Sequence, residues 1–109
     1  MRGLAITIAI MAVIASLAPS LDGQQGPPPR LIVDNRSGSE VQIHVWRFNG
    51  NFWEWSVVAR VAQGHWIPIY YVSNGDQYRA ILPKATRYHT VQLRFDNGYQ
   101  GMQGVWWVE

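Results

Sequence analysis

From residue 30 onwards, short apolar runs alternate with polar turn segments along the chain. The runs recur about every 8 to 12 residues, a spacing typical of β-sandwiches and barrels. They are rich in Val, Ile, Tyr and Trp, which favour extended backbone, and none shows the period of about 3.6 residues that marks an amphipathic helix. The pattern predicts an all-β domain whose seven strands cover residues 31–35, 41–48, 52–61, 66–72, 77–82, 88–95 and 105–108.

The segments between the predicted strands carry turn residues. Asn-Gly pairs occur at residues 49–50, 74–75 and 97–98, and this dipeptide closes tight hairpins because both residues tolerate positive φ. Pro68 stands inside the fourth predicted strand, where it has no N–H to donate to a neighbour, so that strand is expected at a sheet edge or bulged. We interpret the domain as a small seven-stranded antiparallel β-sandwich.

Alternation along each strand assigns side chains to its two faces. In the strand at 41–48, Val41, Ile43 and Val45 share one face, while Trp46 and Phe48 lie on the other. Either this strand is central with its second face partly covered, or Trp46 and Phe48 are exposed. The strand at 52–61 is expected to be half-buried, with one apolar face made of Trp53, Trp55, Val57, Ala59 and Val61.

The N-terminus has the pattern of a secretory signal peptide. Arg2 precedes an apolar run over residues 4–17, and the small residues Ala18 and Ser20 follow. A membrane-spanning helix needs about 20 apolar residues, so this run is short for a permanent anchor. We expect cleavage after Ser20, or as late as Gly23, with an uncleaved N-terminal anchor as the alternative.

The chain is therefore divided into a signal peptide at 1–20, a Pro-rich linker at 21–29 and a β-sandwich domain at 30–109. This organisation predicts a secreted or periplasmic protein with no stable membrane span after signal cleavage. Small exported domains often rely on disulfides, but the chain has no cysteine. Because six Trp, five Tyr and three Phe residues are available instead, we expect an aromatic-rich core.

The charge pattern and the histidines argue against several kinds of partner. The net charge is +2, and the basic residues fall singly rather than in a run, so we expect no nucleic-acid partner. His44, His65 and His89 are widely spaced and no thiolate is available, so neither a metal site nor a cofactor is expected.

The chain lacks the motifs typical of several enzyme classes. There is no Cys nucleophile and no Gly-x-Ser-x-Gly sequence, and no motif pairs Glu54 with Asp76 as two catalytic carboxylates would require. Gly98, Gly101 and Gly104 precede a predicted strand and not a helix, so they are expected to form a mobile loop and not a phosphate site. A non-enzymatic protein is expected, with a small secreted hydrolase as the alternative.

The candidate ligand-binding residues are aromatic. Trp46 and Phe48 flank Arg47, and Trp53 and Trp55 follow across a predicted hairpin. Exposed rings on a sheet can stack on sugars or contact apolar side chains of a partner, and Arg47 would add a hydrogen-bonding fork beside them. These residues predict an exported binding module for a protein, a peptide or a carbohydrate.

The possible functions differ in what they require of the surface. A carbohydrate-binding module predicts a coplanar row of exposed rings. A peptide or protein partner predicts a rimmed apolar patch or a free edge strand. The alternative with no aromatic site is that a domain without disulfides buries nearly all of its rings.

The tripeptide Asn35-Arg36-Ser37, the run ending in Val45-Trp46, Gly50 and Gly64 resemble the β domain of the von Hippel-Lindau tumour suppressor family over about residues 31–82. The resemblance implies a small seven-stranded, transthyretin-like β-sandwich. In that family, a pocket of Trp, Tyr, Ser and His recognises a peptide carrying hydroxyproline. The residues of this chain that match the pocket are Trp46 by position and Tyr71 or Ser73 loosely, while the family's His-Leu-Trp segment is Asp76-Gln77-Tyr78 here.

Asn35-Arg36-Ser37 also fits the acceptor pattern for N-glycosylation, which would matter in a eukaryotic secretory pathway.

Overall fold

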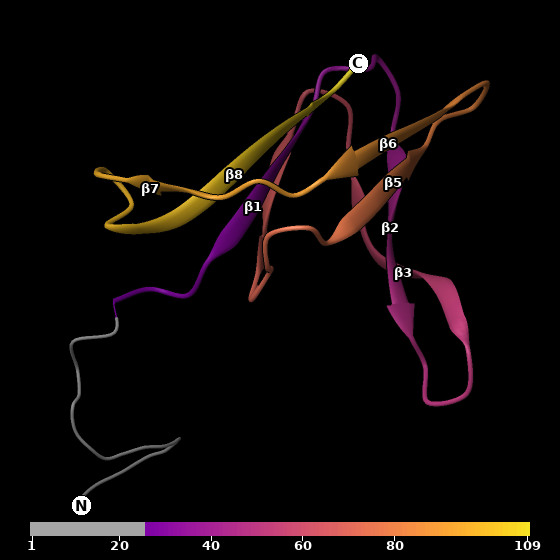
Figure 1. Ribbon diagram of the computed structural model, residues 1–109. Helices are drawn as coiled ribbons and strands as arrows, with labels where there is room; N and C mark the ends of the chain where they lie inside the picture. Colours follow the sequence, from indigo (N-terminus) through magenta and orange to yellow (C-terminus); the bar gives the residue numbers. More distant parts are fainter. Residues whose placement is uncertain (1–25) are drawn as a thin grey trace, which may run out of the picture.

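The computed structural model describes residues 26–109, which form two four-stranded β-sheets (Figure 1). One sheet has the order β4-β1-β8-β7 and the other has the order β3-β2-β5-β6. In chain order, the strands are β1 (Arg30–Asn35), β2 (Val41–Phe48), β3 (Trp53–Val61), β4 (Trp66–Tyr70), β5 (Gln77–Ile81), β6 (Thr86–Thr90), β7 (Arg94–Asp96) and β8 (Gly101–Val108).

The all-β class is confirmed for this part of the chain, but it has eight strands and not the predicted seven. The predicted signal peptide and both cleavage positions lie outside the described residues. No helix among the described residues is long and apolar enough to cross a membrane.

The prediction that all strands pair antiparallel was wrong. β1 and β8 run parallel in the middle of one sheet, with Arg30 opposite Gln103 and Asn35 opposite Val108. Because these strands stand at opposite ends of the domain sequence, no hairpin turn sets their relative direction. Local turn residues therefore give no information about this pairing.

The strand predicted at 88–95 is divided between the two sheets. β6 ends at Thr90 in one sheet, and β7 begins at Arg94 in the other. Between them, the backbone bonds to the β4–β5 loop: the Val91 N–H donates to the Asp76 carbonyl at 2.8 Å, and the Leu93 N–H donates to Asn74 Oδ1 at 2.7 Å. The apolar alternation continues through this crossing, so the sequence pattern concealed it.

The glycine-rich segment before the last strand was predicted as a mobile loop, and this prediction was wrong. β8 begins at Gly101 and includes Gly104. A Cβ atom at Gly104 would lie 2.8 Å from the Gln92 carbonyl oxygen, so only glycine lets the crossing segment approach β8 this closely.

The core is aliphatic, contrary to the aromatic-rich core expected. All six Trp residues lie within the described part of the chain, and Trp106 alone is buried, at 6% exposure. Branched aliphatic side chains fill the space between two packed sheets efficiently, which leaves most of the rings on the outer faces. The buried cluster comprises Leu31, Val33, Val41, Ile43, Val61, Val72, Tyr78, Ala80, Val91, Trp106 and Val108.

Two further predictions concern the edges of the fold. β4 is an edge strand, with Pro68 opposite Ile32 of β1, which confirms the edge position inferred from the proline. The last residues of the predicted linker are fixed to the domain, because Tyr99 Oη donates to the Pro28 carbonyl at 2.6 Å and the Tyr71 N–H donates to the Pro29 carbonyl at 2.7 Å.

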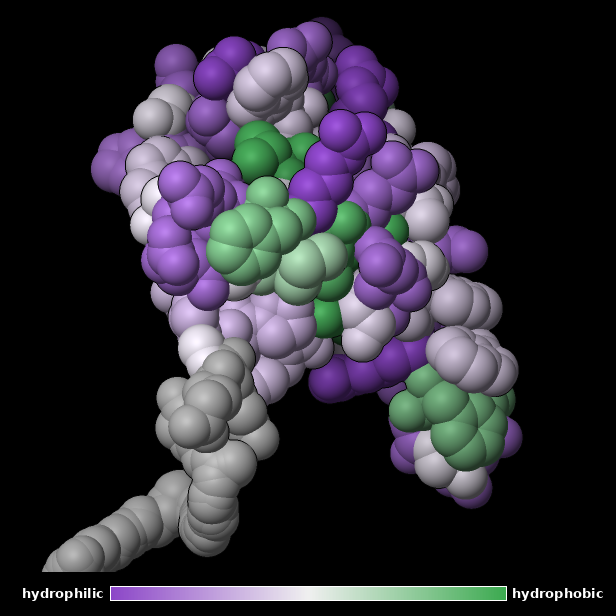
Figure 2. Space-filling view, turned by 60° about the vertical axis from the view of Figure 1, so that its left-hand side comes forward, coloured by the Kyte–Doolittle hydropathy of each residue, from purple (hydrophilic) through white to green (hydrophobic). Residues whose placement is uncertain are grey.

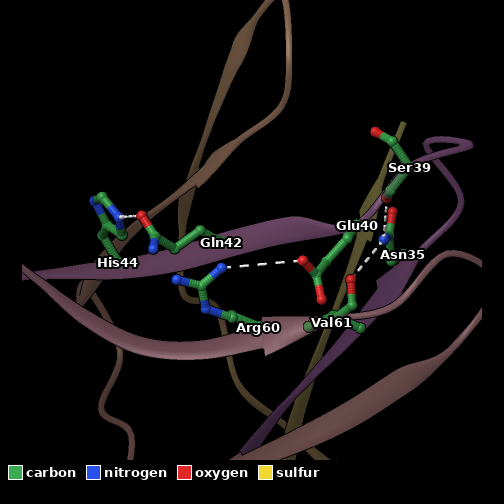
Figure 3. A network of polar contacts seen from close by, with 7 residues as sticks. All are labelled: Asn35, Ser39, Glu40, Gln42, His44, Arg60 and Val61. Atoms are coloured by element: carbon green, nitrogen blue, oxygen red, sulfur yellow. Dashed lines mark hydrogen bonds and ion pairs between the residues drawn. The ribbon is translucent and has the colours of Figure 1, made fainter.

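Asn35 is fully buried at the end of β1 and ties the following turn to β3 (Figure 3). Its Nδ2 group donates to the Ser39 carbonyl at 2.7 Å and to the Val61 carbonyl at 2.9 Å. Its Oδ1 atom accepts the Ser37 N–H at 3.0 Å and the Ser37 hydroxyl at 2.7 Å. With both ends of the amide engaged in the folded state, the acceptor pattern at Asn35 is a structural turn and not an exposed glycosylation site.

Candidate functional site

The β2–β3 hairpin projects beyond the rest of its sheet (Figure 1). β5 pairs with β2 only as far as Val45 opposite Tyr78, whereas β2 and β3 remain paired to Phe48 opposite Trp53. The outer half of the hairpin therefore has no neighbouring strand on its β2 side. Figure 2 shows this projecting lobe, which carries apolar surface at its tip.

A β-bulge determines which way the rings of β3 point. The register shifts between Ile43, which faces Ala59, and His44, which faces Val57, leaving Val58 without an opposite residue. One extra residue reverses the alternation of a strand. Val61 lies in the core and Ala59 packs against it. Trp53 and Trp55 lie on the other face of the strand. The prediction that all five apolar side chains of this strand share one face was therefore wrong.

The bulge brings four predicted site residues together. Trp46 lies opposite Trp55, and Phe48 lies opposite Trp53, so all four rings project from one face of the hairpin. Tyr88 of β6 extends the group, with its ring centroid 6.0 Å from that of Trp55. We call Trp46, Phe48, Trp53, Trp55 and Tyr88 the aromatic face. Tyr88 was missed from the sequence because its position depends on the sheet order β2-β5-β6.

Most of the aromatic face is open to solvent. The exposed fractions are 38% for Trp46, 51% for Phe48 and 58% for Trp53, while Trp55 is half-buried. Contiguous exposed apolar surface of this kind marks binding sites more often than scattered single residues do. Of the two alternatives for the strand at 41–48, the structure shows Trp46 and Phe48 exposed, although β2 also lies inside its sheet, between β3 and β5.

The rings of the aromatic face do not form one plane. Trp46 and Trp53 are parallel within 18°, with centroids 6.4 Å apart, which is an offset-stacked arrangement. Trp55 is tilted by 56° from Trp46, and Phe48 is tilted by 57° from Trp53. A ligand that stacks on this face can therefore lie flat on Trp46 or Trp53 but not along the whole row.

Arg79 of β5 lies beside the rings in a fixed position. Its guanidinium carbon is 4.6 Å from the centroid of the Trp55 ring, and its Nε group donates to His44 Nδ1 at 2.9 Å. His44 Nε2 lies 2.7 Å from Gln42 Oε1, a contact drawn in Figure 3. Burial, and then the charge of Arg79, lower the pKa of His44, so the neutral imidazole accepts from Arg79 and donates to Gln42.

Arg47 lies on the opposite face of the hairpin from its two neighbours, Trp46 and Phe48. It faces Glu54 across the strand pair and is close enough to Tyr78 to affect its ionisation. Burial, followed by the charge of Asp76, raises the pKa of Tyr78 to about 12, against an opposing effect of Arg47. A guanidinium group beside the rings was predicted at Arg47. In the structure, the guanidinium group in that position belongs to Arg79.

A hollow of about 390 Å³ opens beside the aromatic face, at the point where β5 begins. The hollow is lined by Trp46, Trp53, Gly75, Asp76 and Gln77. Asp76 Oδ2 accepts the Ser73 N–H at 2.9 Å, which holds the carboxylate in place within the β4–β5 turn. Asp76 and Gln77 were not predicted as ligand contacts, since they reach the hairpin only through the pairing of β5 with β2.

Two of the three histidines have packing contacts. His44 belongs to the Arg79 contact, and His89 stacks on Trp106, with centroids 5.0 Å apart and an interplanar angle of 8°. Burial lowers the pKa of His89. Within residues 26–109, no group of three His, Cys, Asp or Glu side chains is arranged to hold a metal ion.

No family model matches the chain, and comparisons with curated proteins and with solved structures also found no match. The resemblance to the von Hippel-Lindau β domain therefore stays a prediction. A function for this chain is inferred from the geometry of the aromatic face and of the hollow beside it.

Proposed function

We propose that this chain is a non-enzymatic carbohydrate-binding module that holds its ligand on the aromatic face. The observation that carries the proposal is the group of exposed rings on one face of the β2–β3 hairpin, beside a hollow with polar lining. The C–H face of a sugar ring is apolar and stacks on indole, while its hydroxyl groups need polar partners at the edge of the ring. Asp76 and Gln77 supply such partners next to Trp46 and Trp53, and Arg79 supplies a further one beside Trp55.

The exposed rings do not form the coplanar row that a carbohydrate-binding module was expected to present, and their tilts favour a short ligand contact instead. Only Trp46 and Trp53 share an orientation, so the site suits one or two sugar units of a single chain and not the flat surface of a crystalline polysaccharide. The export predicted from residues 1–20 would place the domain where such chains occur.

A peptide partner added as an edge strand is supported less well. The free edge beside Pro68 is available for strand addition, but Pro68 has no N–H to offer an added strand. The aromatic face with its polar neighbours also meets the requirement of a rimmed apolar patch, so a peptide or protein bound there is the second candidate.

Titration with soluble oligosaccharides, followed by tryptophan fluorescence, tests the proposal. Trp53→Ala should weaken binding about tenfold, since an aromatic contact contributes about 1.5 kcal/mol. Trp66→Ala is the matched control, because Trp66 is exposed to 57%, against 58% for Trp53, but lies in β4 of the other sheet. The proposal fails if a panel of neutral and charged glycans shows no binding, or if both variants lose affinity equally.

A further inference from the structure

The hollow beside Trp46 and Trp53 combines a carboxylate with two aromatic rings, and these groups attract a cation more strongly than a neutral sugar. Asp76 is the charged residue among those that line it. The bond from the Ser73 N–H to Asp76 Oδ2, 2.9 Å long, fixes the carboxylate within the turn. The indole faces of Trp46 and Trp53 are themselves electron-rich and attract cations.

The neighbouring basic side chains point elsewhere. Arg79 is held over the Trp55 ring by its bond to His44, and Arg47 lies on the opposite face of the hairpin. Neither guanidinium lines the hollow. Within the hollow itself, the carboxylate of Asp76 and the faces of the two indoles are therefore the groups that a cation would meet.

We propose that the hollow binds the ammonium group of an amino sugar, as in a chain of glucosamine units. The inference rests on the proposed function, since it assigns the kind of sugar that the aromatic face holds. The sugar ring stacks on Trp46 or Trp53, and its ammonium group lies against the carboxylate of Asp76. The volume of about 390 Å³ falls within the range of small-ligand pockets, about 300 to 1,000 Å³.

The selectivity expected from this arrangement is moderate, because the hollow is open to solvent. An exposed ion pair and an exposed cation–π contact each contribute little, and together they correspond to about a tenfold preference for the charged sugar. The preference should shrink as the salt concentration rises, since both contributions are electrostatic.

The test compares three oligomers of equal length: glucosamine, N-acetylglucosamine and cellulose oligomers, at a pH at which the glucosamine amines are protonated. The wild-type protein should bind the glucosamine oligomer about tenfold more tightly than the other two. Asp76→Asn removes the charge but retains an oxygen for the Ser73 N–H, and it should reduce the preference to within about twofold.

Glu54→Gln is the matched control. It removes the same charge from the face of the β2–β3 hairpin opposite the aromatic face and should leave the preference unchanged. Equal affinity for all three oligomers, or a preference that survives in Asp76→Asn, overturns the amino-sugar assignment. If the three oligomers bind equally and Trp53→Ala weakens all of them, the carbohydrate-binding proposal stands while the inference about the hollow is wrong.

Discussion

Replacing Asn35 by Ala should destabilise the domain far more than replacing an asparagine in an exposed turn. The Asn35 side chain is fully buried and makes four hydrogen bonds, to Ser37, Ser39 and Val61. The bond to the Val61 carbonyl is buried, whereas the other three are partly accessible to water. Alanine would leave the Val61 carbonyl without its donor, in a place that water does not reach.

The magnitude follows from these contacts. A buried carbonyl that loses its partner costs about 1 to 3 kcal/mol, and each bond that water can partly replace costs about 0.5 kcal/mol. The sum is a loss of about 3 kcal/mol in the free energy of unfolding. For a domain of this size, each 1 kcal/mol lowers the melting temperature by about 4 to 8 °C, so the expected decrease is about 12 to 24 °C.

Asn49→Ala provides the comparison. Asn49 Oδ1 accepts the N–H groups of Asn51 at 2.8 Å and of Phe52 at 3.0 Å in an exposed turn, so its loss should cost less than about 1 kcal/mol. Urea unfolding, with the slope of the transition checked for constancy, measures both variants. A difference of less than about 1 kcal/mol between them would refute the role assigned to the buried amide.

Two further predictions concern stability. Acid should destabilise the fold, because burial lowers the pKa of His44 and of His89 in the folded state, while the unfolded chain takes up protons below about pH 6.5. The stability that the two neutral histidines contribute is present above about pH 6.5 and is lost as the pH falls through their folded-state pKa values. A urea midpoint that stays constant from about pH 7.5 to about pH 5 would contradict this prediction. Gly104→Ala should cost about 1 to 3 kcal/mol, since its Cβ would lie 2.8 Å from the Gln92 carbonyl oxygen. Gly98→Ala, whose Cβ would meet a side-chain oxygen at 3.3 Å, should have a smaller effect on the urea midpoint.

Much of the candidate site could be predicted from local patterns. Trp46 and Phe48 alternate with core residues of β2, whose bounds agree with the prediction. Trp53 and Trp55 follow after one turn, so a hairpin necessarily brings these four rings near one another. Their common face could not be predicted, because the bulge at Val58 interrupts the regular alternation on which the assignment of faces depends.

The remaining parts of the site come from strands that are distant in the sequence. Arg79, Asp76 and Tyr88 reach the hairpin through the order β2-β5-β6. The division of the strand at 88–95 between two sheets was missed for a related reason. A chain can keep its apolar alternation while its hydrogen-bond partners change, as the bonds from Val91 and Leu93 to the β4–β5 loop show.

Local patterns along the chain were enough to identify the extended segments, most of the turns and the all-β class, since these properties depend on backbone preferences and on side chains close together in the chain. The sheet order, the parallel pairing of β1 with β8, the aliphatic core and the outward direction of most tryptophans depend on long-range packing and could not be read from those patterns. A two-residue period distinguishes the two faces of a strand but not which face meets the second sheet. That choice is made by contacts between distant strands, and it left the rings of the β2–β3 hairpin exposed to solvent.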